Sequence, residues 1–455
     1  MHASITCGCV ALGRNSVRHA WVPIGKLKPY ANHARKHNRH QRRKIRRLLE
    51  QLGTQPVPVL CSPELAIIDG HALWAELREL GVAEVFVAIV QNQSAAEINA
   101  LRLSINRIPL DTRWDEARLR QEISALIDLS FDLELTAFDA CEIDALMRID
   151  LPEANLIEDE FATGSTTSAA VAIAGDIFVL GPHRIGCGDA ADGTFVQQVR
   201  KNQLADMCFV DPPYNVRIDG FVSGKGRARH RDFLEASGEL SSQEFFAFLH
   251  DTLGVLRAAS SPRALIYACM DFRHILEMTA AGRLLGMHLL NICVWTKNNG
   301  GMGSLYRSRH EMICVFKAGS EQHINNVELG RFGRNRTNVW SHPGMSAFGA
   351  DRGELLASHP TVKPVALVAD AIRDVTKRGD CILDTFLGSG TTLIAAEETG
   401  RRCVGLDLDP GYIDLAVRRW QKLAGCDAYH EASGLSFDDL AAQRQEPTRK
   451  LTHGR

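Results

Sequence analysis

Residues 379–410 read GDCILDTFLGSGTTLIAAEETGRRCVGLDLDP and predict two strands joined by a glycine turn and a helix. The apolar run at 381–384 has the length and composition of a buried strand and leads into Gly388-Ser389-Gly390. The helix after it ends at Gly400, and a second strand covers 403–406. This succession is the unit from which parallel α/β sheets are built.

The glycine turn and the acid after the second strand indicate a nucleoside site. Glycines let the backbone approach a ligand, and an acid at the end of the next strand accepts hydrogen bonds from ribose hydroxyls. Asp407 follows Gly390 by 17 residues, close to the roughly twenty residues typical of such sites. Leu393 replaces the third glycine of a dinucleotide fingerprint, which favours a nucleoside without phosphates. Taken alone, the segment also fits a tight turn followed by an ordinary acid at a helix start.

A second motif lies in ADMCFVDPPYNV, residues 205–216. An apolar strand runs directly into Asp211, Pro212, Pro213 and Tyr214. Proline fixes φ, so the tetrapeptide holds a carboxylate, a carbonyl and an aromatic ring in one geometry. A strand-terminating turn is the alternative for this motif alone.

Composition describes an ordinary globular chain. Its 455 residues are 45% hydrophobic and 23% charged, enough for two or three cores. There is no apolar run of about eighteen residues, so we expect no transmembrane helix. The first twenty residues lack a secretory pattern, so we expect a cytoplasmic protein. The twelve cysteines are scattered, which favours buried thiols in a reducing compartment over disulfides or a metal site.

Patterning divides the chain into five segments. Short apolar strands alternate with helical patterns over 175–425, which predicts a doubly wound α/β sheet. The predicted segments are a small α/β unit at 20–110, a helical connector at 111–150, a Gly/Ser/Thr-rich linker at 151–174, the α/β sheet domain at 175–425 and a loosely held tail at 426–455. Within the first unit, residues 35–47 carry eight Lys or Arg and no acid, a local basic surface of the kind that contacts DNA.

Together, the two motifs resemble those of the DNA amino-methyltransferases, the N6-adenine and N4-cytosine methylase family that uses S-adenosylmethionine. DPPY is similar to the catalytic motif of that family, and DTFLGSGTT to its cofactor loop; their order is that of the permuted beta class. HPTVKP at 359–364 and CGDA around Asp189 resemble two further family motifs. The resemblance covers about 175–425 and implies a Rossmann-like methyltransferase fold. Thr385 stands where the family usually has proline, and Asp407 where it often has glutamate.

The resemblance implies three sets of site residues. The catalytic set is Asp211, Pro212, Pro213 and Tyr214. The S-adenosylmethionine set is Asp189, Lys363, Asp384, Phe386, Gly388, Ser389, Gly390, Thr391 and Asp407. A target-recognition insert at about 298–350 supplies the DNA-binding set, Arg307, Arg309, Arg331, Arg334 and Arg336.

Residues 20–110 resemble ParB-like domains, through WVPIGKLKPYANHARKHNR and IIDGHALWAEL. His71, Ala72 and Leu73 replace the arginine pair that partition proteins carry after the glycine. Neither nuclease activity nor nucleotide binding is therefore carried over. We expect an accessory module that contacts DNA or forms dimers.

The resemblance implies a site-specific adenine-N6 methyltransferase acting on a base flipped out of duplex DNA. The leading aspartate of DPPY favours adenine over cytosine-N4, which is the alternative within the family. A DNA-binding or partition-type protein with a vestigial methylase fold is the alternative from another class. The sequence leaves open the target site, a cognate restriction enzyme and a homodimer. It predicts a nucleoid-associated protein with no membrane partner.

Overall fold

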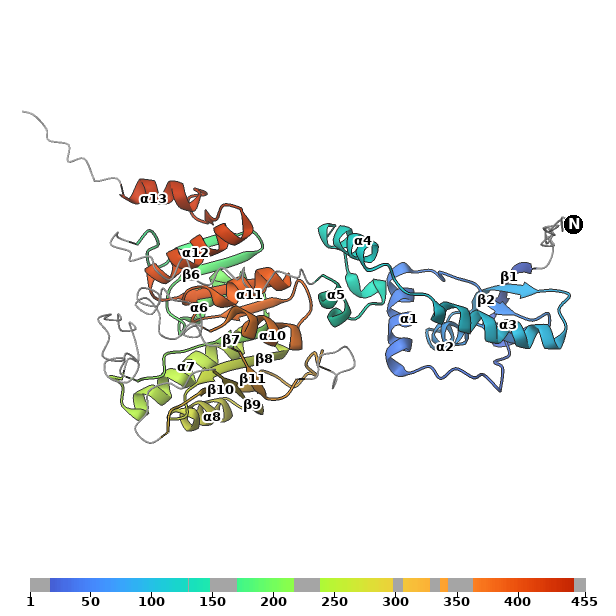
Figure 1. The fold of residues 1–455 in the computed structure, drawn as a ribbon, viewed down its shortest axis with the longest axis horizontal. Helices are drawn as coiled ribbons and strands as arrows, with labels where there is room; N and C mark the ends of the chain where they lie inside the picture. The colour runs from blue at the N-terminus through green and yellow to red at the C-terminus, as the bar shows by residue number, and fades with distance from the viewer. Residues whose placement is uncertain are drawn as a thin grey trace, which may run out of the picture. The chain divides into compact units, whose positions relative to one another are not determined.

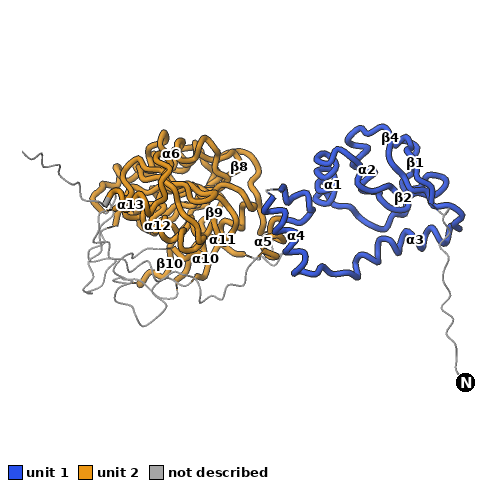
Figure 2. Tube along the Cα trace, turned by 90° about the horizontal axis from the view of Figure 1, so that it is seen from above, with its two compact units in different colours: residues 1–139 blue, residues 140–455 orange. Residues whose placement is uncertain are grey.

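The computed structural model describes residues 17–129, 131–147, 170–216, 238–297, 306–327, 336–342 and 363–445. The chain divides into two compact units, residues 1–139 and 140–455 (Figure 2). Among the described residues, no helix is both long and apolar enough to cross a membrane.

The first unit is built on a four-stranded sheet with the order β1-β4-β2-β3. Strand β4 pairs antiparallel with β1 and parallel with β2, and its inner side chains pack on α1 and α2. The elements are β1 (Val17–Pro23), η1 (Ile24–Lys26), α1 (Arg39–Leu52), β2 (Val59–Cys61), β3 (Ile67–Asp69), α2 (His71–Glu79), β4 (Glu84–Val90), α3 (Ala95–Arg107), η2 (Ile108–Asp111), α4 (Glu116–Asp128) and η3 (Leu133–Thr136).

Half of the positive charge in the basic segment is paired with acids within this unit. Arg42 and Arg46 form ion pairs with Glu76 of α2, which is almost fully buried, and with its neighbour Glu79. Two more cations of α1 pair with acids near η3: Arg47 with Asp132 and Glu134, and Lys44 with Asp139. Only part of the basic surface expected to contact DNA is therefore available for it, because these cations hold α1 against its neighbours.

The second unit contains a ten-stranded sheet with the order β11-β9-β10-β8-β7-β12-β13-β6-β5-β14. Figure 1 shows the helices and strands of this unit as a ribbon. The five central strands, from β8 to β6, are parallel, and antiparallel strands extend the sheet on both sides. The strands are β5 (Ile177–Leu180), β6 (His183–Cys187), β7 (Ala205–Val210), β8 (Ser260–Met270), β9 (His288–Thr296), β10 (His310–Lys317), β11 (Val339–Ser341), β12 (Cys381–Asp384), β13 (Arg402–Asp407) and β14 (Tyr429–His430).

Helices cover both faces of this sheet, as the doubly wound prediction requires. Along β7, Met207 and Phe209 pack into the core formed with α10, α11 and α12, while Cys208 and Val210 pack into the core formed with α6, α7 and α8. A strand buried on both faces reads as a continuous apolar run, which is why these strands were recognisable in the sequence. The helices are α6 (Gly193–Val199), α7 (Ser242–Ala259), α8 (Ile275–Leu284), α10 (Val365–Val375), α11 (Thr391–Thr399), α12 (Pro410–Ala424) and α13 (Phe437–Gln445).

Residues 426–445 are not the loosely held tail that the sequence predicts. Strand β14 pairs with β5, and Phe437 of α13 is fully buried in the core with α12. Arg444 also forms an ion pair with Asp176, next to β5. Two short elements with only two large apolar anchors, Phe437 and Leu440, give too little periodicity to be recognised from sequence alone. Residues 446–455 lie outside the described residues.

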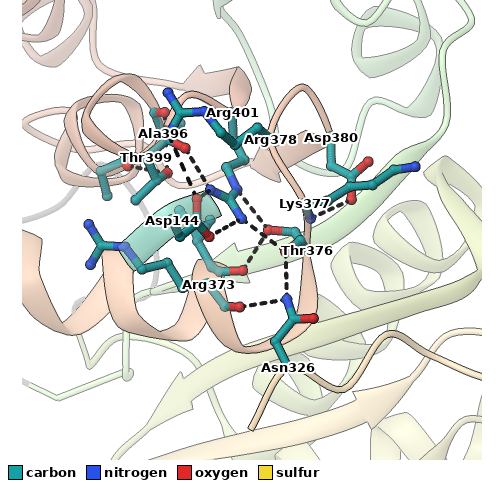
Figure 3. A network of polar contacts seen from close by, with 12 residues as sticks. Asp144, Asn326, Arg373, Thr376, Lys377, Arg378, Asp380, Ala396, Thr399 and Arg401 are labelled. Carbon is teal, nitrogen blue, oxygen red and sulfur yellow. Dashed lines mark hydrogen bonds and ion pairs between the residues drawn. The ribbon is translucent and has the colours of Figure 1, made fainter. Parts of the chain in front are cut away.

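The second unit begins at α5 (Ala140–Leu146), before the linker predicted at 151–174. The cause is a buried ion pair: both carboxylate oxygens of Asp144 accept hydrogen bonds from Arg401 at 2.8 Å (Figure 3). Arg401 is 1% exposed, and it also donates to the carbonyls of Thr376 and Thr399. A bidentate Arg–carboxylate pair is directional, so it fixes α5 against the ends of α10 and α11. Residues 148–169, which include most of the linker predicted at 151–174, are outside the described ranges.

Replacing Asp144 with alanine is expected to lower the free energy of unfolding by about 3–5 kcal/mol, because Arg401 would stay buried without its countercharge. Denaturant and thermal unfolding of the full chain measure this change. As the control, Asp427→Ala removes an exposed carboxylate from the same unit and should cost less than about 0.5 kcal/mol. Equal stability of the two variants would contradict the role given to Asp144.

Candidate active site

Four neighbouring parallel strands place an acid at the same edge of the sheet. Asp211 follows β7, Asp384 ends β12, Asp407 ends β13, and Asp189 comes shortly after β6. Carboxyl ends of parallel strands share an edge, where α/β proteins bind their ligands. Residues that the sequence separates by up to about 220 positions are therefore brought to one line.

The glycine turn between β12 and α11 has the geometry expected of it. Gly388 and Gly390 have φ of +52° and +87°, a region that favours glycine. A Cβ atom on Gly390 would lie 3.0 Å from the Cβ of Ala416, so this glycine also permits close packing of α12. The Gly388 amide donates to Asp407 Oδ2 at 2.7 Å, and the Asp409 amide donates to Oδ1 at 2.9 Å. The turn and the acid at the end of β13 therefore hold each other in place.

The other residues predicted for the cofactor loop surround this turn. The Phe386 amide donates to Asp384 Oδ1 at 2.9 Å, and its ring packs edge-on against Phe248. The Ser389 hydroxyl accepts a hydrogen bond from Arg419 of α12 at 3.0 Å, and Thr391 begins α11. Asp189 is exposed and caps its own turn through the Ala191 amide.

The loop contains buried polar atoms whose hydrogen-bonding capacity is not fully used within the described residues, and a nucleoside could supply the missing partners. Burial raises the pKa of both Asp384 and Asp407 to about 7, and neither carboxylate has an ion pair within the described part of the chain. Thr385 Oγ1 is buried and has no hydrogen-bond partner among the described residues. A ligand rich in hydroxyl and amino groups would satisfy these atoms without adding a charge.

The catalytic candidates Asp211 and Tyr214 are joined to Lys363. The Tyr214 hydroxyl donates to Asp211 Oδ1 at 2.7 Å. The Lys363 ammonium donates to Asp211 Oδ2 and lies 3.3 Å from the Tyr214 oxygen. The sequence analysis assigned Lys363 to the cofactor set, but its recorded contacts are with the catalytic motif.

Two residues of this cluster were not predicted. Glu311, the second residue of β10, pairs with Lys363 at 3.0 Å, and its Oε2 lies 3.2 Å from the Tyr214 hydroxyl oxygen. Lys297, directly after β9, forms an ion pair with the other oxygen of Glu311. Strands β9 and β10 are antiparallel, so the end of one and the start of the other fall at the same edge. The sequence signal that could have identified Lys297 and Glu311 is a polar residue at each of these two strand ends.

The charges in the cluster alternate between acids and lysines. Burial raises the pKa of Glu311, but Lys363 and Lys297 more than offset this and lower it to about 2. Burial lowers the pKa of Lys363, but Asp211 and Glu311 outweigh burial and raise it. The pKa of Asp211 is raised by burial and by Glu311, although Lys363 opposes the shift.

Asn215 is a third residue that the sequence analysis missed. It has φ of +52°, and its side chain bonds the Gly238 and Leu240 amides and the Leu240 carbonyl at 2.8–3.2 Å. Asparagine tolerates this conformation better than most residues. Asn215 thus fixes the backbone directly after the DPPY motif.

The predicted DNA-binding arginines do not share one environment. Arg307 and Arg309 are exposed beside Tyr306, just before β10. Arg336 is instead mostly buried, in ion pairs with Asp370 and Asp374 of α10 at 2.6 and 2.8 Å. Its guanidinium is occupied by carboxylates, so a DNA-reading role does not fit its position. Arg331 and Arg334 lie outside the described residues.

Comparison with known proteins identifies the family. Residues 205–418, from β7 to α12, match the model of a DNA methylase family, and residues 117–168 match the ParB-methyltransferase HTH domain. Residues 205–418 are therefore a DNA methylase domain of the N6/N4 type. The matched region of the methylase includes both the DPPY motif and the glycine turn. The HTH match confirms a ParB relationship, although it covers α4, α5 and part of the predicted linker and begins after residues 20–110.

Individual relatives share part of this methylase. Type II methyltransferase M2.DpnII of Streptococcus pneumoniae is 27% identical over 227 residues, which is 48% of this chain and 83% of the relative. M2.LlaDCHI of Lactococcus lactis subsp. cremoris is 27% identical over 240 residues, 51% of this chain and 88% of the relative. Among solved structures, the DNA modification methylase TTHA0409 of Thermus thermophilus, complexed with S-adenosyl-L-methionine, matches with 21% identity and a TM-score of 0.38 over 56% of this chain and 96% of its own.

Replacing Asp384 with asparagine is expected to stabilise the ligand-free methylase at pH 8 by about 1–3 kcal/mol. An acid whose folded-state pKa is raised to about 7 lowers the stability of the fold as the pH rises from its unfolded-state pKa of about 4 to about 7, because the unfolded chain ionises first. The gain should therefore be clearly smaller at pH 5, near the lower end of that range, than at pH 8. Thermal unfolding at both pH values measures the effect; a gain independent of pH would contradict it.

Proposed function

We propose that this methylase is a site-specific DNA methyltransferase that moves a methyl group from S-adenosylmethionine to adenine N6. The observation that carries the proposal is the position of Asp211. This half-buried acceptor, held by Tyr214 and Lys363, directly follows the strand next to β12 and its glycine turn. An amino group at Asp211 would therefore lie beside whatever the turn binds.

The residues of the turn fit the methyl donor. We assign the ribose hydroxyls to Asp407, at the end of β13, and the base of the nucleoside to Asp189, after the neighbouring strand β6. Gly388, Ser389 and Gly390 allow close approach of the backbone, and Asp384 and Thr385 offer polar atoms that are not fully used. When bound, S-adenosylmethionine supplies an electrophilic methyl group.

Asp211 and Pro212 prepare the amino group for this chemistry. The lone pair of an exocyclic amine is delocalised into the base, which makes the nitrogen a poor nucleophile. If Asp211 and the Pro212 carbonyl each accept one amino hydrogen, the nitrogen is drawn toward a tetrahedral geometry and its lone pair is aimed. The nitrogen must lose one proton when it gains the methyl group, and Asp211 is placed to take it.

The base must leave the duplex to reach Asp211, because its amino group is paired and stacked there. We assign stacking on the flipped base to the half-buried Tyr214, whose hydroxyl is anchored by Asp211. Cytosine presents the same kind of amino group, so cytosine-N4 methylation is the alternative activity. The leading Asp211 supports adenine.

Asp211→Asn is expected to reduce DNA methylation by about 10²–10⁴-fold, because an amide is a weaker acceptor and cannot take the proton. The assay uses labelled S-adenosylmethionine and mixed-sequence duplex DNA, followed by digestion to nucleosides. N6-methyladenine supports the proposal, and N4-methylcytosine supports the alternative. Asp251→Asn, at an exposed position on α7, is the control. A chain that binds the cofactor but labels no DNA would instead indicate a DNA-binding protein with an inactive methylase fold.

Arg309→Ala is expected to weaken DNA binding and to reduce the slope of log affinity against log salt by about one, because one phosphate contact is lost. Arg336→Ala should leave that slope unchanged and lower the thermal stability, because Asp370 and Asp374 lose their partner. Salt titrations of DNA binding by both variants measure the difference. A similar change of slope in both variants would contradict the distinct roles.

A further inference from the structure

Glu311 is a buried carboxylate at the catalytic motif that the proposed reaction does not use. It lies across Lys363 from Asp211, on the antiparallel part of the sheet. Its side chain is 10% exposed, and that of Lys363 is 4% exposed. A buried carboxylate is costly unless it is paired, so its presence beside Asp211 needs a physical reason.

The contacts of Lys363 account for its whole donor capacity. An ammonium has three hydrogens, and the three oxygen atoms around Nζ are Asp211 Oδ2, Glu311 Oε2 at 3.0 Å and the Tyr214 hydroxyl at 3.3 Å. The Tyr214 hydrogen is directed to Asp211 Oδ1 at 2.7 Å. Every donor of Lys363 and Tyr214 is therefore assigned, and their positions are mutually fixed.

Because Lys363 is shared between Asp211 and Glu311, the strength of Asp211 as a hydrogen-bond acceptor changes. If Lys363 faced Asp211 alone, the two would form a closed ion pair, and the carboxylate would be a weaker acceptor for a substrate amine. Glu311 also forms an ion pair with the ammonium, which weakens the interaction of the ammonium with Asp211. Lys297 binds the other oxygen of Glu311 and lies over the ring of Trp295 at 4.7 Å, which holds Glu311 in place from the other side.

We propose that Glu311 is a positioning residue that sets the acceptor strength of Asp211 by sharing Lys363, with Lys297 holding Glu311 in turn. The proposal rests on the proposed amino-methyltransferase function, since it concerns the same carboxylate. Glu311 acts through Lys363 and Tyr214 and has no recorded contact with the Asp211 carboxylate itself.

The charges around Asp211 give the sign of the effect. The titratable groups that face or surround it come from six elements and their flanks: Tyr214 after β7, Cys269 on β8, Lys297 after β9, Glu311 on β10, Asp384 on β12 and Lys363 before α10. The Glu311 carboxylate raises the pKa of Asp211, and Lys363 lowers it. Removing the charge of Glu311 should thus lower the pKa of Asp211, whereas removing Lys297 leaves Glu311 to draw more strongly on Lys363 and should raise it.

The test compares Glu311→Gln, Lys297→Met and the unaltered chain in single-turnover DNA methylation from pH 5 to pH 9. We expect Glu311→Gln to slow methyl transfer by about 10–100-fold and to move the acidic limb of the rate profile down by about one pH unit. Lys297→Met should move the same limb in the opposite direction. Glu321→Gln, an exposed site just past the other end of β10, makes the same charge change as a control.

Binding of S-adenosylmethionine, measured by calorimetry, should change less than about twofold in both test variants, because neither side chain reaches the glycine turn. If the unaltered chain methylates DNA and both variants keep its rate and acidic limb, the role of Glu311 is overturned while the function stands. If the unaltered chain binds the cofactor but labels no DNA, the function fails, and the role of Glu311 fails with it. Since Lys297 is partly exposed, Lys297→Met still provides the pH test if Glu311→Gln does not fold.

Discussion

The catalytic end of this methylase depends on one buried ammonium, that of Lys363. Two carboxylates and a phenol oxygen converge on it from β7, β10 and their flanks. Without a cation, Asp211 and Glu311 could not both stay ionised in this position, because like charges in a low dielectric repel strongly. The segment that carries Lys363 is thus held to the catalytic motif by charge as well as by packing of the following helix, α10.

The same sheet edge contains acids in two electrostatic states. Glu311 has two lysines and a lowered pKa, whereas Asp384 and Asp407 have only hydrogen-bond donors and a raised pKa. The paired group can remain charged and positioned during a reaction. Asp384 and Asp407 have no cation to offset the cost of burying their charge. This is the state expected of side chains that bind the hydroxyl and amino groups of a ligand. With the proposed function, the group that has lysine partners would position the substrate, and the acids without lysine partners would bind the methyl donor.

Sequence reasoning was most successful where the signal is local. The strands β7, β12 and β13, the helix α11 and the glycine turn follow from short apolar runs and glycines, and they carry Asp211, Asp384 and Asp407 to the predicted edge. Glu311, Lys297 and Arg336 could not be placed in this way, because their roles depend on pairing of β9 with β10 and on packing against α10. Arg336 is an example. An arginine among glycines and aromatic residues suggests DNA binding, but Arg336 forms ion pairs with two aspartates on one face of α10. The basic helix α1 gives the same lesson, since acids distant in sequence neutralise much of it.

The antiparallel strands explain why the missed residues belong to the catalytic edge at all. Strand β10 pairs with β8, the neighbour of β7, so its first residues lie beside the end of the catalytic strand. Lys297 and Arg309 exchange hydrogen bonds at the base of this strand pair, at 2.7 Å from the Lys297 amide and 2.9 Å from the Arg309 side chain. The exposed residues Arg307 and Arg309 are therefore continuous with Glu311 and Lys297. A contact between DNA phosphates and these arginines would act on the same stretch of backbone that carries Glu311. Because Glu311 pairs with Lys363, DNA binding at the arginines would have a direct physical route to Asp211.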